Sequence, residues 1–291
     1  MKPAKFEYIA PSTIADAVAA LARYGDGAKV LAGGQSLVPL MNMRLARPEV
    51  IVDINGITEL DYLRANADGH LAIGALSRQR QLERQAVVRE RFPVLTEASE
   101  LIGHFQIRNR GTIGGSLAHS DPSAELPAVM TALDAEFFIT STAGSRSVPA
   151  SEFFVTYLTT ALQPADLLTE IRVPELPQGT GSRVYEVSRR HGDFALVGAV
   201  TLLEPGANGK ISNARIALFG VNPTPVRATE AEALLAGQDP SEALFREAGE
   251  RAARDLDPDG DIHASAEYRK EVAAVVVRRA LVSAAERMGA P

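Results

Sequence analysis

The 291-residue chain contains no cysteine. It therefore cannot form a disulfide, use a thiolate nucleophile, or hold zinc or an iron–sulfur cluster through cysteine ligands. Lysine and arginine number 30 against 36 acidic residues. The chain thus lacks the excess of positive charge that a broad nucleic-acid or acidic-membrane surface requires. These absences exclude several classes of metal, redox and nucleic-acid-binding protein.

Long apolar runs and familiar targeting or catalytic signatures are also missing. No stretch approaches the roughly 18 to 20 apolar residues of a membrane-spanning helix, and residues 1–10 lack the basic-then-apolar order of a secretory signal. Neither G-x-S-x-G nor H-E-x-x-H occurs, and the 5 histidines have no metal-ligand spacing. We therefore expect a cytoplasmic protein with no membrane span, no nucleic-acid surface and no metal of its own.

What is present has the pattern of an α+β protein. In residues 1–56, apolar residues recur at helical spacing over 14–24, behind an N-cap at Ser12 or Thr13. Short strands are predicted at 29–32 and 50–54. This opening therefore predicts a strand–helix–strand unit, with a glycine pair just beyond its strand at 29–32.

The middle of the chain mixes hairpins and helices. Hairpins are predicted at 62–73, around Asp68-Gly69, and at 136–149, with a further strand at 167–173. A helical pattern covers 78–101 with a break at Pro93. A glycine-rich stretch at 111–116 then precedes a helical run to about residue 133.

A segment rich in proline and glycine at 175–182 is the best linker candidate. We predict an N-terminal domain at 1–176, with subdomains at about 1–56 and 57–176, and a smaller C-terminal domain at 180–291. The C-terminal domain is expected to be a three-stranded antiparallel sheet followed by helices. Its strands are predicted at 184–188, 196–203 and 211–221, and its helices at 228–236, 241–256 and 266–288.

The first motif that could carry chemistry is Leu31, Ala32, Gly33, Gly34, Gln35, Ser36, Leu37 and Val38. Glycines directly after a strand let the backbone turn sharply and bring its N–H groups to a bound anion, and Ser36 adds a hydroxyl. A helix starting near Pro39 would point its positive end the same way. This chemistry suits a diphosphate. A plain strand-to-helix turn is the alternative, because glycine pairs are common in turns.

A second glycine pair lies in Thr112, Ile113, Gly114, Gly115 and Ser116. Lysine is missing after both pairs, so neither is a Walker loop, and no G-x-G-x-x-G motif is formed. We expect the two segments to converge, so that their N–H groups form the two walls of a cradle for a long dinucleotide.

Two acidic segments are ambiguous from the residues alone. Asp121 and Glu125 either stabilise a helix N-terminus or accept hydrogen bonds from a sugar or ribityl hydroxyl. Arg190 and Asp193, between two predicted strands, either form a surface ion pair or belong to a turn that faces an anionic reduced cofactor.

Together these motifs resemble the flavin-binding medium subunit of molybdenum hydroxylases, the family of the carbon monoxide dehydrogenase medium subunit and of the flavin domain of xanthine dehydrogenase. The matching segments are A-G-G-Q-S at 32–36, T-I-G-G-S at 112–116, A-E-L-P at 124–127, R-R-H-G-D-F-A at 189–195 and G-V-N-P-T-P-V-R-A at 220–228. The resemblance runs over about residues 6–288. It implies a two-subdomain FAD-binding domain of the PCMH/vanillyl-alcohol-oxidase type, followed by an α+β domain of the CO dehydrogenase flavoprotein type.

The resemblance also implies which residues contact FAD. The segment from Leu31 to Val38 would wrap the diphosphate, with Thr112, Gly114, Gly115 and Ser116 on the opposite wall. Glu125 stands where relatives often have an aspartate that contacts the sugar-like part of the flavin. Leu168 and Ile102 stand where others have neighbours of the flavin ring. Tyr185 replaces a lysine of some relatives and is expected to stack or to donate its hydroxyl. Arg189 and Arg190 would stabilise the anionic reduced flavin.

The implied role is electron transfer within a complex. Members of the family work with a large molybdopterin subunit, which oxidises the substrate, and a small subunit with two [2Fe–2S] clusters. The present chain, without cysteine, would hold FAD alone and pass electrons to an external acceptor. The expected assembly is a dimer of heterotrimers, and no catalytic residue is assigned to this chain.

Several alternatives stay open at this point. The substrate of the complex could be carbon monoxide, an aldehyde, a purine or another N-heterocycle, and the acceptor could be dioxygen, a quinone, a cytochrome or NAD. A stand-alone flavoprotein that uses His104, His119 or Asp193 as its base is a different function. A flavin-free assembly module is another.

Overall fold

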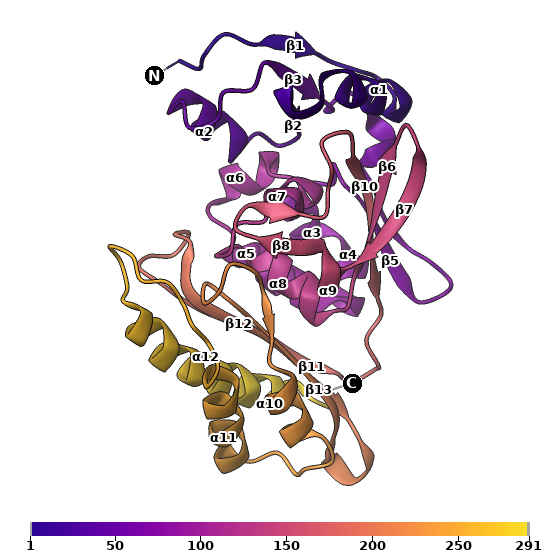
Figure 1. The fold of residues 1–291 in the computed structure, drawn as a ribbon. Helices are drawn as coiled ribbons and strands as arrows, with labels where there is room; N and C mark the ends of the chain where they lie inside the picture. The colour runs from indigo at the N-terminus through magenta and orange to yellow at the C-terminus, as the bar shows by residue number, and fades with distance from the viewer. Residues whose placement is uncertain (1, 290–291) are drawn as a thin grey trace.

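The computed structural model describes residues 2–289, which form three units stacked along one axis (Figure 1). We call them the N-terminal unit (residues 7–60), the central unit (63–174) and the C-terminal unit (181–287). The N-terminal unit lies at one end and the C-terminal unit at the other, so the central unit contacts both.

The N-terminal unit is a small parallel sheet packed against a helix. Its elements are β1 (Glu7–Ile9), α1 (Ile14–Tyr24), η1 (Gly25–Gly27), β2 (Ala28–Leu31), α2 (Leu37–Asn42), β3 (Val50–Asp53) and η2 (Thr58–Leu60). The strand order is β1-β3-β2, with both pairings parallel. The hydroxyl oxygen of Thr13 caps α1 by accepting a hydrogen bond from the N–H of Asp16 (3.1 Å). The predicted strand–helix–strand unit is confirmed.

The central unit is built on a five-stranded antiparallel sheet in the order β4-β5-β10-β6-β7. Both predicted hairpins and the predicted strand near 167–173 are present, and that strand is the middle one. A separate two-stranded hairpin, β8–β9, follows β6 and β7 in the chain. The strands are β4 (Leu63–Ala65), β5 (His70–Gly74), β6 (Glu136–Ser141), β7 (Gly144–Pro149), β8 (Phe154–Thr156), β9 (Thr159–Thr160) and β10 (Leu167–Pro174).

The helices of the central unit are shorter than the sequence pattern predicts. The run at 78–101 is divided at Pro93 as expected, and also at Gln85, whose backbone is extended (φ −72°, ψ 121°). The run toward residue 133 is divided at Ser120, which has a left-handed backbone (φ 53°). The helices are α3 (Gln79–Arg84), α4 (Ala86–Arg91), α5 (Pro93–Leu101), α6 (Phe105–Arg110), α7 (Ile113–His119), α8 (Glu125–Ala132) and α9 (Ala150–Phe153).

The C-terminal unit contains an antiparallel sheet in the order β11-β12-β13-β14. The expectation of three strands was wrong by one, because Val226 and Arg227 pair with Leu218 and Ala217 and form a fourth. Two residues are too few to show an alternating pattern in the sequence. The elements are β11 (Gly181–Ser188), β12 (Ala195–Pro205), η3 (Ala207–Gly209), β13 (Ile211–Phe219), β14 (Val226–Arg227), α10 (Thr229–Leu235), α11 (Glu242–Ala253) and α12 (Ala266–Arg287).

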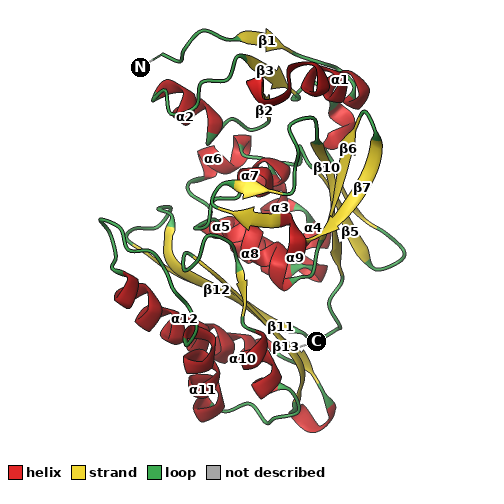
Figure 2. Cartoon of the chain, in the orientation of Figure 1, coloured by secondary structure: helices red, strands yellow, loops and turns green. Residues whose placement is uncertain are grey.

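Both faces of this sheet are covered. Figure 2 shows α10, α11 and α12 on one face, and helices of the central unit on the other. Along β12 the side chains alternate: Val200 and Leu202 belong to the core of the central unit, and Ala199 and Leu203 belong to the core beneath α10–α12. None of the helices within residues 2–289 is long and apolar enough to cross a membrane.

Candidate cofactor-binding site

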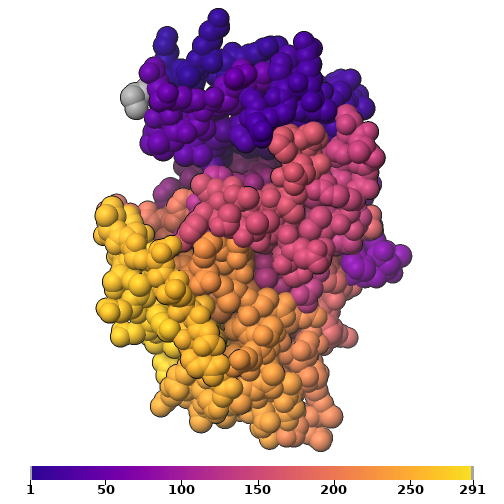
Figure 3. Space-filling model, viewed as in Figure 1, coloured from indigo at the N-terminus to yellow at the C-terminus, as the bar shows by residue number. Residues whose placement is uncertain are grey.

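A cavity of about 790 Å³ lies where the N-terminal and central units meet, and Figure 3 shows the surface hollowed between them. Its walls come from the loop after β2, from α7 and the loop behind it, from β10, and from the loop between β11 and β12. The residues predicted from sequence that line it are Ala32, Gly33, Gly34, Gln35, Ser36, Leu37, Ile102, Thr112, Gly114, Gly115, Ser116, Glu125 and Leu168. Segments far apart in the sequence therefore converge on one cavity.

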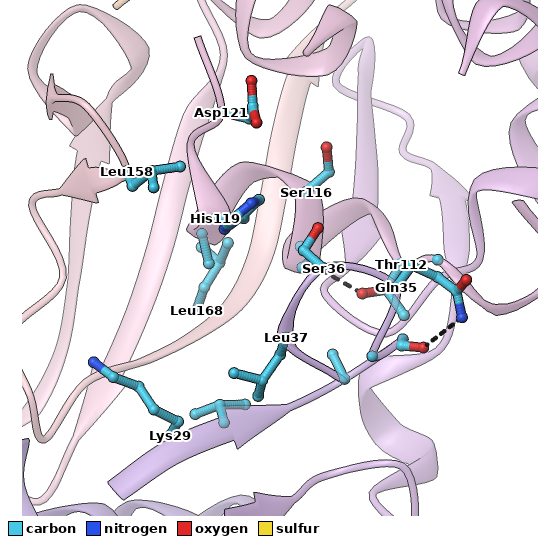
Figure 4. Close-up of a pocket in the computed structure, with 18 of the residues that line it drawn as sticks. Lys29, Gln35, Ser36, Leu37, Thr112, Ser116, His119, Asp121, Leu158 and Leu168 are labelled. Atoms are coloured by element: carbon cyan, nitrogen blue, oxygen red, sulfur yellow. Dashed lines mark hydrogen bonds between the residues drawn. The ribbon is translucent and has the colours of Figure 1, made fainter. Parts of the chain in front are cut away.

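The loop after β2 has its carbonyl groups bound by the protein. The side-chain amide of Asn55 donates to the carbonyl oxygen of Ala32 (2.8 Å), and that of Gln35 donates to the carbonyl oxygen of Gly33 (3.3 Å; Figure 4). Asn55 is itself held, because Arg78 donates to its side-chain oxygen (2.8 Å). These contacts fix the direction of the peptide planes in the loop.

The N–H groups of the same loop are left without partners. Gly34 has a φ of 73°, a left-handed conformation that glycine adopts without strain. Within residues 2–289, no acceptor is bound by the backbone N–H groups of Gly33, Gly34, Gln35 and Ser36. A run of free N–H groups beside a cavity is suited to an anion.

Replacing Asn55 with alanine is expected to weaken FAD binding about tenfold, because the loop loses the hydrogen bond that orients it, worth about 1 to 1.5 kcal/mol. Titration of the full chain with FAD, followed by flavin fluorescence, measures the effect. Asn66→Ala is the matched control, since Asn66 is exposed on the β4–β5 hairpin. Equal affinities for the two variants would contradict the orienting role.

Gly33 allows the two glycine segments to touch. A Cβ atom at Gly33 would lie 2.4 Å from the carbonyl oxygen of Arg110 and 2.8 Å from the Cα of Gly111. The same carbonyl oxygen of Arg110 accepts a hydrogen bond from Arg78 (2.6 Å). The N-terminal and central units thus meet backbone to backbone at this point, and the predicted convergence of the two segments is confirmed.

The second glycine pair is not the open loop that the sequence predicts. Gly114 and Gly115 lie in the first turn of α7, where their N–H groups donate to the carbonyl oxygen of Ala75 and to Thr112 Oγ1 (both 3.0 Å). The expectation that both segments offer free N–H groups is therefore wrong for this one, because Thr112 caps a helix here. The segment offers the cavity the hydroxyls of Thr112 and Ser116 instead, which Figure 4 shows on one side of the cavity.

Glu125 is a buried carboxyl group in the cavity wall. It is the first residue of α8 and only 5% exposed, and no other residue within 2–289 hydrogen-bonds to its side chain. Burial, followed by the charge of Glu186, raises the pKa of Glu125 to about 8. Burial also raises the pKa of Glu186 to about 7. Glu125 is therefore mostly protonated at neutral pH.

The loop between β11 and β12 closes one side of the cavity through Gly192, Asp193 and Phe194. Asp193 pairs with Arg189 (3.3 Å), so the predicted ion pair of Asp193 with Arg190 is wrong. The four-residue spacing brings Arg189 back toward Asp193. Neither arginine lines the cavity. The loop rests on the central unit, since a Cβ at Gly192 would lie 2.8 Å from the ring of His104.

Three residues predicted to contact the cofactor lie outside this cavity. Leu31 and Val38 line a smaller one, of about 330 Å³, behind the same loop. Tyr185 lines neither; its ring packs in the C-terminal unit, and its hydroxyl accepts a hydrogen bond from Arg279 (2.9 Å). Tyr185 lies three residues before the end of β11, and a strand residue can face either side of the sheet, which the sequence alone does not specify.

Other residues of the cavity wall carry no sequence signal that points to a ligand. Gln79 is 5% exposed, and within residues 2–289 its side-chain oxygen is buried without a hydrogen-bond partner. Lys29 lies two positions ahead of the predicted segment and at the far end of the cavity in Figure 4. The turn of the β8–β9 hairpin contributes Leu158. Among residues 2–289, no three histidine, aspartate or glutamate side chains gather as a metal site would require.

Comparison with known protein families gives two matches that together span most of the chain. Residues 4–176 match the FAD binding domain in molybdopterin dehydrogenase, and residues 183–284 match the CO dehydrogenase flavoprotein C-terminal domain. The chain is 43% identical over 287 residues to the 6-hydroxypseudooxynicotine dehydrogenase complex subunit alpha of Paenarthrobacter nicotinovorans, covering 99% of this chain and 97% of that one. It is 40% identical over 290 residues to the caffeine dehydrogenase subunit beta of a Pseudomonas species, with coverage of 99% and 97%.

A solved structure has the same fold over the whole chain. It is a chain of the carbon monoxide dehydrogenase from Hydrogenophaga pseudoflava, in a form that lacks the Mo-pyranopterin moiety of the molybdenum cofactor. The TM-score is 0.96 at 39% identity, and the match covers 99% of this chain and 100% of the other.

Proposed function

Because the chain belongs to the family of FAD-binding medium subunits of molybdopterin dehydrogenases, we propose that it holds FAD in the cavity between its N-terminal and central units and serves as the electron outlet of an oxidoreductase complex. The resemblance drawn from the sequence motifs and the two-domain α+β fold are both confirmed. The relatives named above are subunits of dehydrogenases.

One observation of this chain carries the proposal: a run of unbound N–H groups borders a cavity of about 790 Å³ at the seam between two units. These N–H groups, from Gly33 to Ser36, match the diphosphate of a dinucleotide. The cavity also presents the hydroxyls of Thr112 and Ser116, the unpartnered side-chain oxygen of Gln79 and the carboxyl group of Glu125, which match a ligand rich in hydroxyl and amide groups. The residues present therefore fit FAD.

The residues of the chain have separate tasks in this proposal. The loop after β2 binds the diphosphate, and Thr112 and Ser116 complete the opposite wall. Leu168, which is 4% exposed, and Ile102 provide an apolar surface for the flavin ring. Bound FAD supplies the redox chemistry, because a flavin exchanges electrons singly or in pairs. The chain supplies position and electrostatics, and no acid–base group of its own is required.

We further propose that the complex contains a large molybdopterin subunit and a small subunit with two [2Fe–2S] clusters, arranged as a dimer of heterotrimers in the cytoplasm. The names of the relatives as subunits of dehydrogenases support a multi-subunit complex. The absence of cysteine supports a division of labour, since the clusters require thiolate ligands that this chain does not have.

The purified full chain is expected to bind one FAD, and dithionite should reduce the bound flavin and remove its visible absorbance. A small organic substrate should not reduce the flavin in the absence of partner subunits. Absorbance at the flavin bands measures all three. Rapid reduction by such a substrate would instead identify a stand-alone flavoprotein, for which His119 and Asp193 line the cavity as candidate bases. A chain that takes up no FAD on reconstitution would contradict the proposal and indicate an assembly module.

A further inference from the structure

Glu125, which is buried, and Glu186, which is half-buried, are two acids whose presence the FAD site described above does not explain. Glu125 belongs to the cavity wall and Glu186 to β11 of the C-terminal unit. Buried carboxylates in proteins normally have a cationic partner or several hydrogen bonds. Within residues 2–289, the side chain of Glu125 accepts a hydrogen bond from its own backbone N–H and from no other residue, and Oε2 of Glu186 is buried without a partner. The two acids are close enough for the charge of Glu186 to act on Glu125.

The charged groups around the pair do not neutralise it. Arg108 of α6 is the cation that acts on Glu125, but its guanidinium is bound to Glu83 (2.5 Å) and to the carbonyl oxygens of Ile102 and Gly103. Asp121, in the loop ahead of α8, adds further negative charge. For Glu186, burial is the cause of its shifted pKa, and no cation opposes it.

Among the elements packed against α8 and β11, α12 covers the other face of the sheet and carries Glu267, Arg269, Lys270, Glu271, Arg278, Arg279, Glu286 and Arg287. Glu97 binds both Arg183 and Arg287; Arg215 binds Glu204, Arg227 binds Glu232, and Arg279 binds the hydroxyl of Tyr185. The remaining titratable side chains on α5, α7 and α9 are Glu100, His119 and Glu152. None of these acts on Glu125 in the way that Glu186 does.

We propose that Glu125 binds FAD as a neutral carboxylic acid, donating its O–H to a hydroxyl oxygen of the cofactor, and that Glu186 is a positioning residue that keeps it neutral. This inference rests on the proposed FAD site. An ionised Glu125 would face a negative neighbour and the negatively charged diphosphate of the same ligand, whereas a neutral acid avoids both repulsions. The proposal reverses the role expected from sequence, in which a carboxylate accepts hydrogen bonds from the cofactor.

The inference makes FAD affinity depend on pH. Since the pKa of Glu125 in the free chain is about 8, the binding-competent protonated form predominates below pH 7 and is a minor form at pH 9. The dissociation constant for FAD is therefore expected to rise about tenfold between pH 7 and pH 9.

The test is a titration of the deflavinated full chain with FAD at a series of pH values from about 6.5 to 9, followed by flavin fluorescence. The Glu125→Gln variant carries a neutral amide that can still donate, so its affinity should be independent of pH and within about threefold of the unmodified chain at pH 7. Glu186→Gln removes the neighbouring charge and so should lower the pKa of Glu125. The rise in the dissociation constant for FAD should therefore begin at a lower pH. Glu152→Gln, on the exposed surface of α9, is the control and should follow the unmodified chain.

A second measurement covers the case in which the Glu125 variant folds poorly. Calorimetry of FAD binding at pH 8.5, in buffers of different ionisation enthalpy, counts protons, and the unmodified chain should take up most of one proton. Affinity that is flat or increases with pH, or binding without proton uptake, would overturn the inference and leave the FAD site intact. Failure to bind FAD at every pH would refute the proposed function itself.

Discussion

The Gly33→Ala variant is expected to bind FAD at least about 100-fold more weakly than the unmodified chain. Its new Cβ atom would lie 2.4 Å from the carbonyl oxygen of Arg110, and that oxygen belongs to backbone that cannot rotate away as a side chain can. The seam between the N-terminal and central units must open by several tenths of an ångström or more. The displaced loop would lose hydrogen bonds to the charged diphosphate, and two such bonds, at about 1.5 kcal/mol each, correspond to about two orders of magnitude in affinity.

The control for this variant is Gly56→Ala, in the same part of the chain. A Cβ at Gly56 would have only an ordinary contact, 3.5 Å from the carbonyl oxygen of Pro11, and we expect its affinity for FAD to stay within a few-fold. Circular dichroism of both variants without FAD separates loss of binding from loss of fold. A Gly33→Ala chain that is folded and binds FAD as tightly as Gly56→Ala would refute the close approach as a requirement of the site.

Replacing Arg108 with methionine is expected to lower the free energy of unfolding by about 1.5 to 3 kcal/mol, because it removes the charged hydrogen bonds of Arg108 and leaves the carboxylate of Glu83 with only one of its two arginine partners, Arg80. Arg108 is 8% exposed and joins Glu83 (2.5 Å) to the carbonyl oxygens of Ile102 (2.9 Å) and Gly103 (3.1 Å). Those two residues line the cavity, so FAD affinity should fall as well. Urea unfolding of the chain without FAD measures the first effect.

Arg254→Met is the control for burial, since Arg254 binds the carboxylates of Glu230 and Asp255 on the open surface. It should change stability little, because surface ion pairs contribute little. Adding Glu83→Gln to Arg108→Met should restore part of the stability, because it removes a carboxylate that has lost one of its two arginine partners. A single Arg108→Met variant that unfolds at the same urea concentration as the Arg254 control would show that the buried network is dispensable.

The fold was largely predictable because its pattern is local. The helix at 14–24 and the hairpins at 62–73 and 136–149 follow from side-chain periodicity and turn residues, and the structure contains them. The two-residue strand β14 and the helix break at Gln85 were not predictable. The first depends on a partner strand already in place, and the second has no proline or glycine to mark it.

The site was predictable where glycine marks a backbone conformation that other residues rarely adopt. It was less predictable where the properties of a side chain depend on tertiary packing. The glycine pair at 33–34 lies in a loop after a strand, as expected, and the loop borders the cavity. The pair at 114–115 has a similar sequence but lies in a helix, because Thr112 caps it and Ala75 accepts its N–H. The state of Glu125 depends on Glu186, which lies in another unit, so no local pattern announces it.

The central and C-terminal units share one apolar core, and this core should determine the order in which the chain unfolds. One apolar cluster contains side chains from both, among them Leu126, Leu202 and Phe219, whereas the cluster around Leu21 and Val52 belongs to the N-terminal unit and takes in only Leu76 and Leu167 of the central unit. The central and C-terminal units should therefore unfold together as one cooperative block, and the smaller N-terminal unit should unfold as a second block. A ligand lying across the seam ties the two blocks together, so occupancy of the cavity would merge two melting transitions into one.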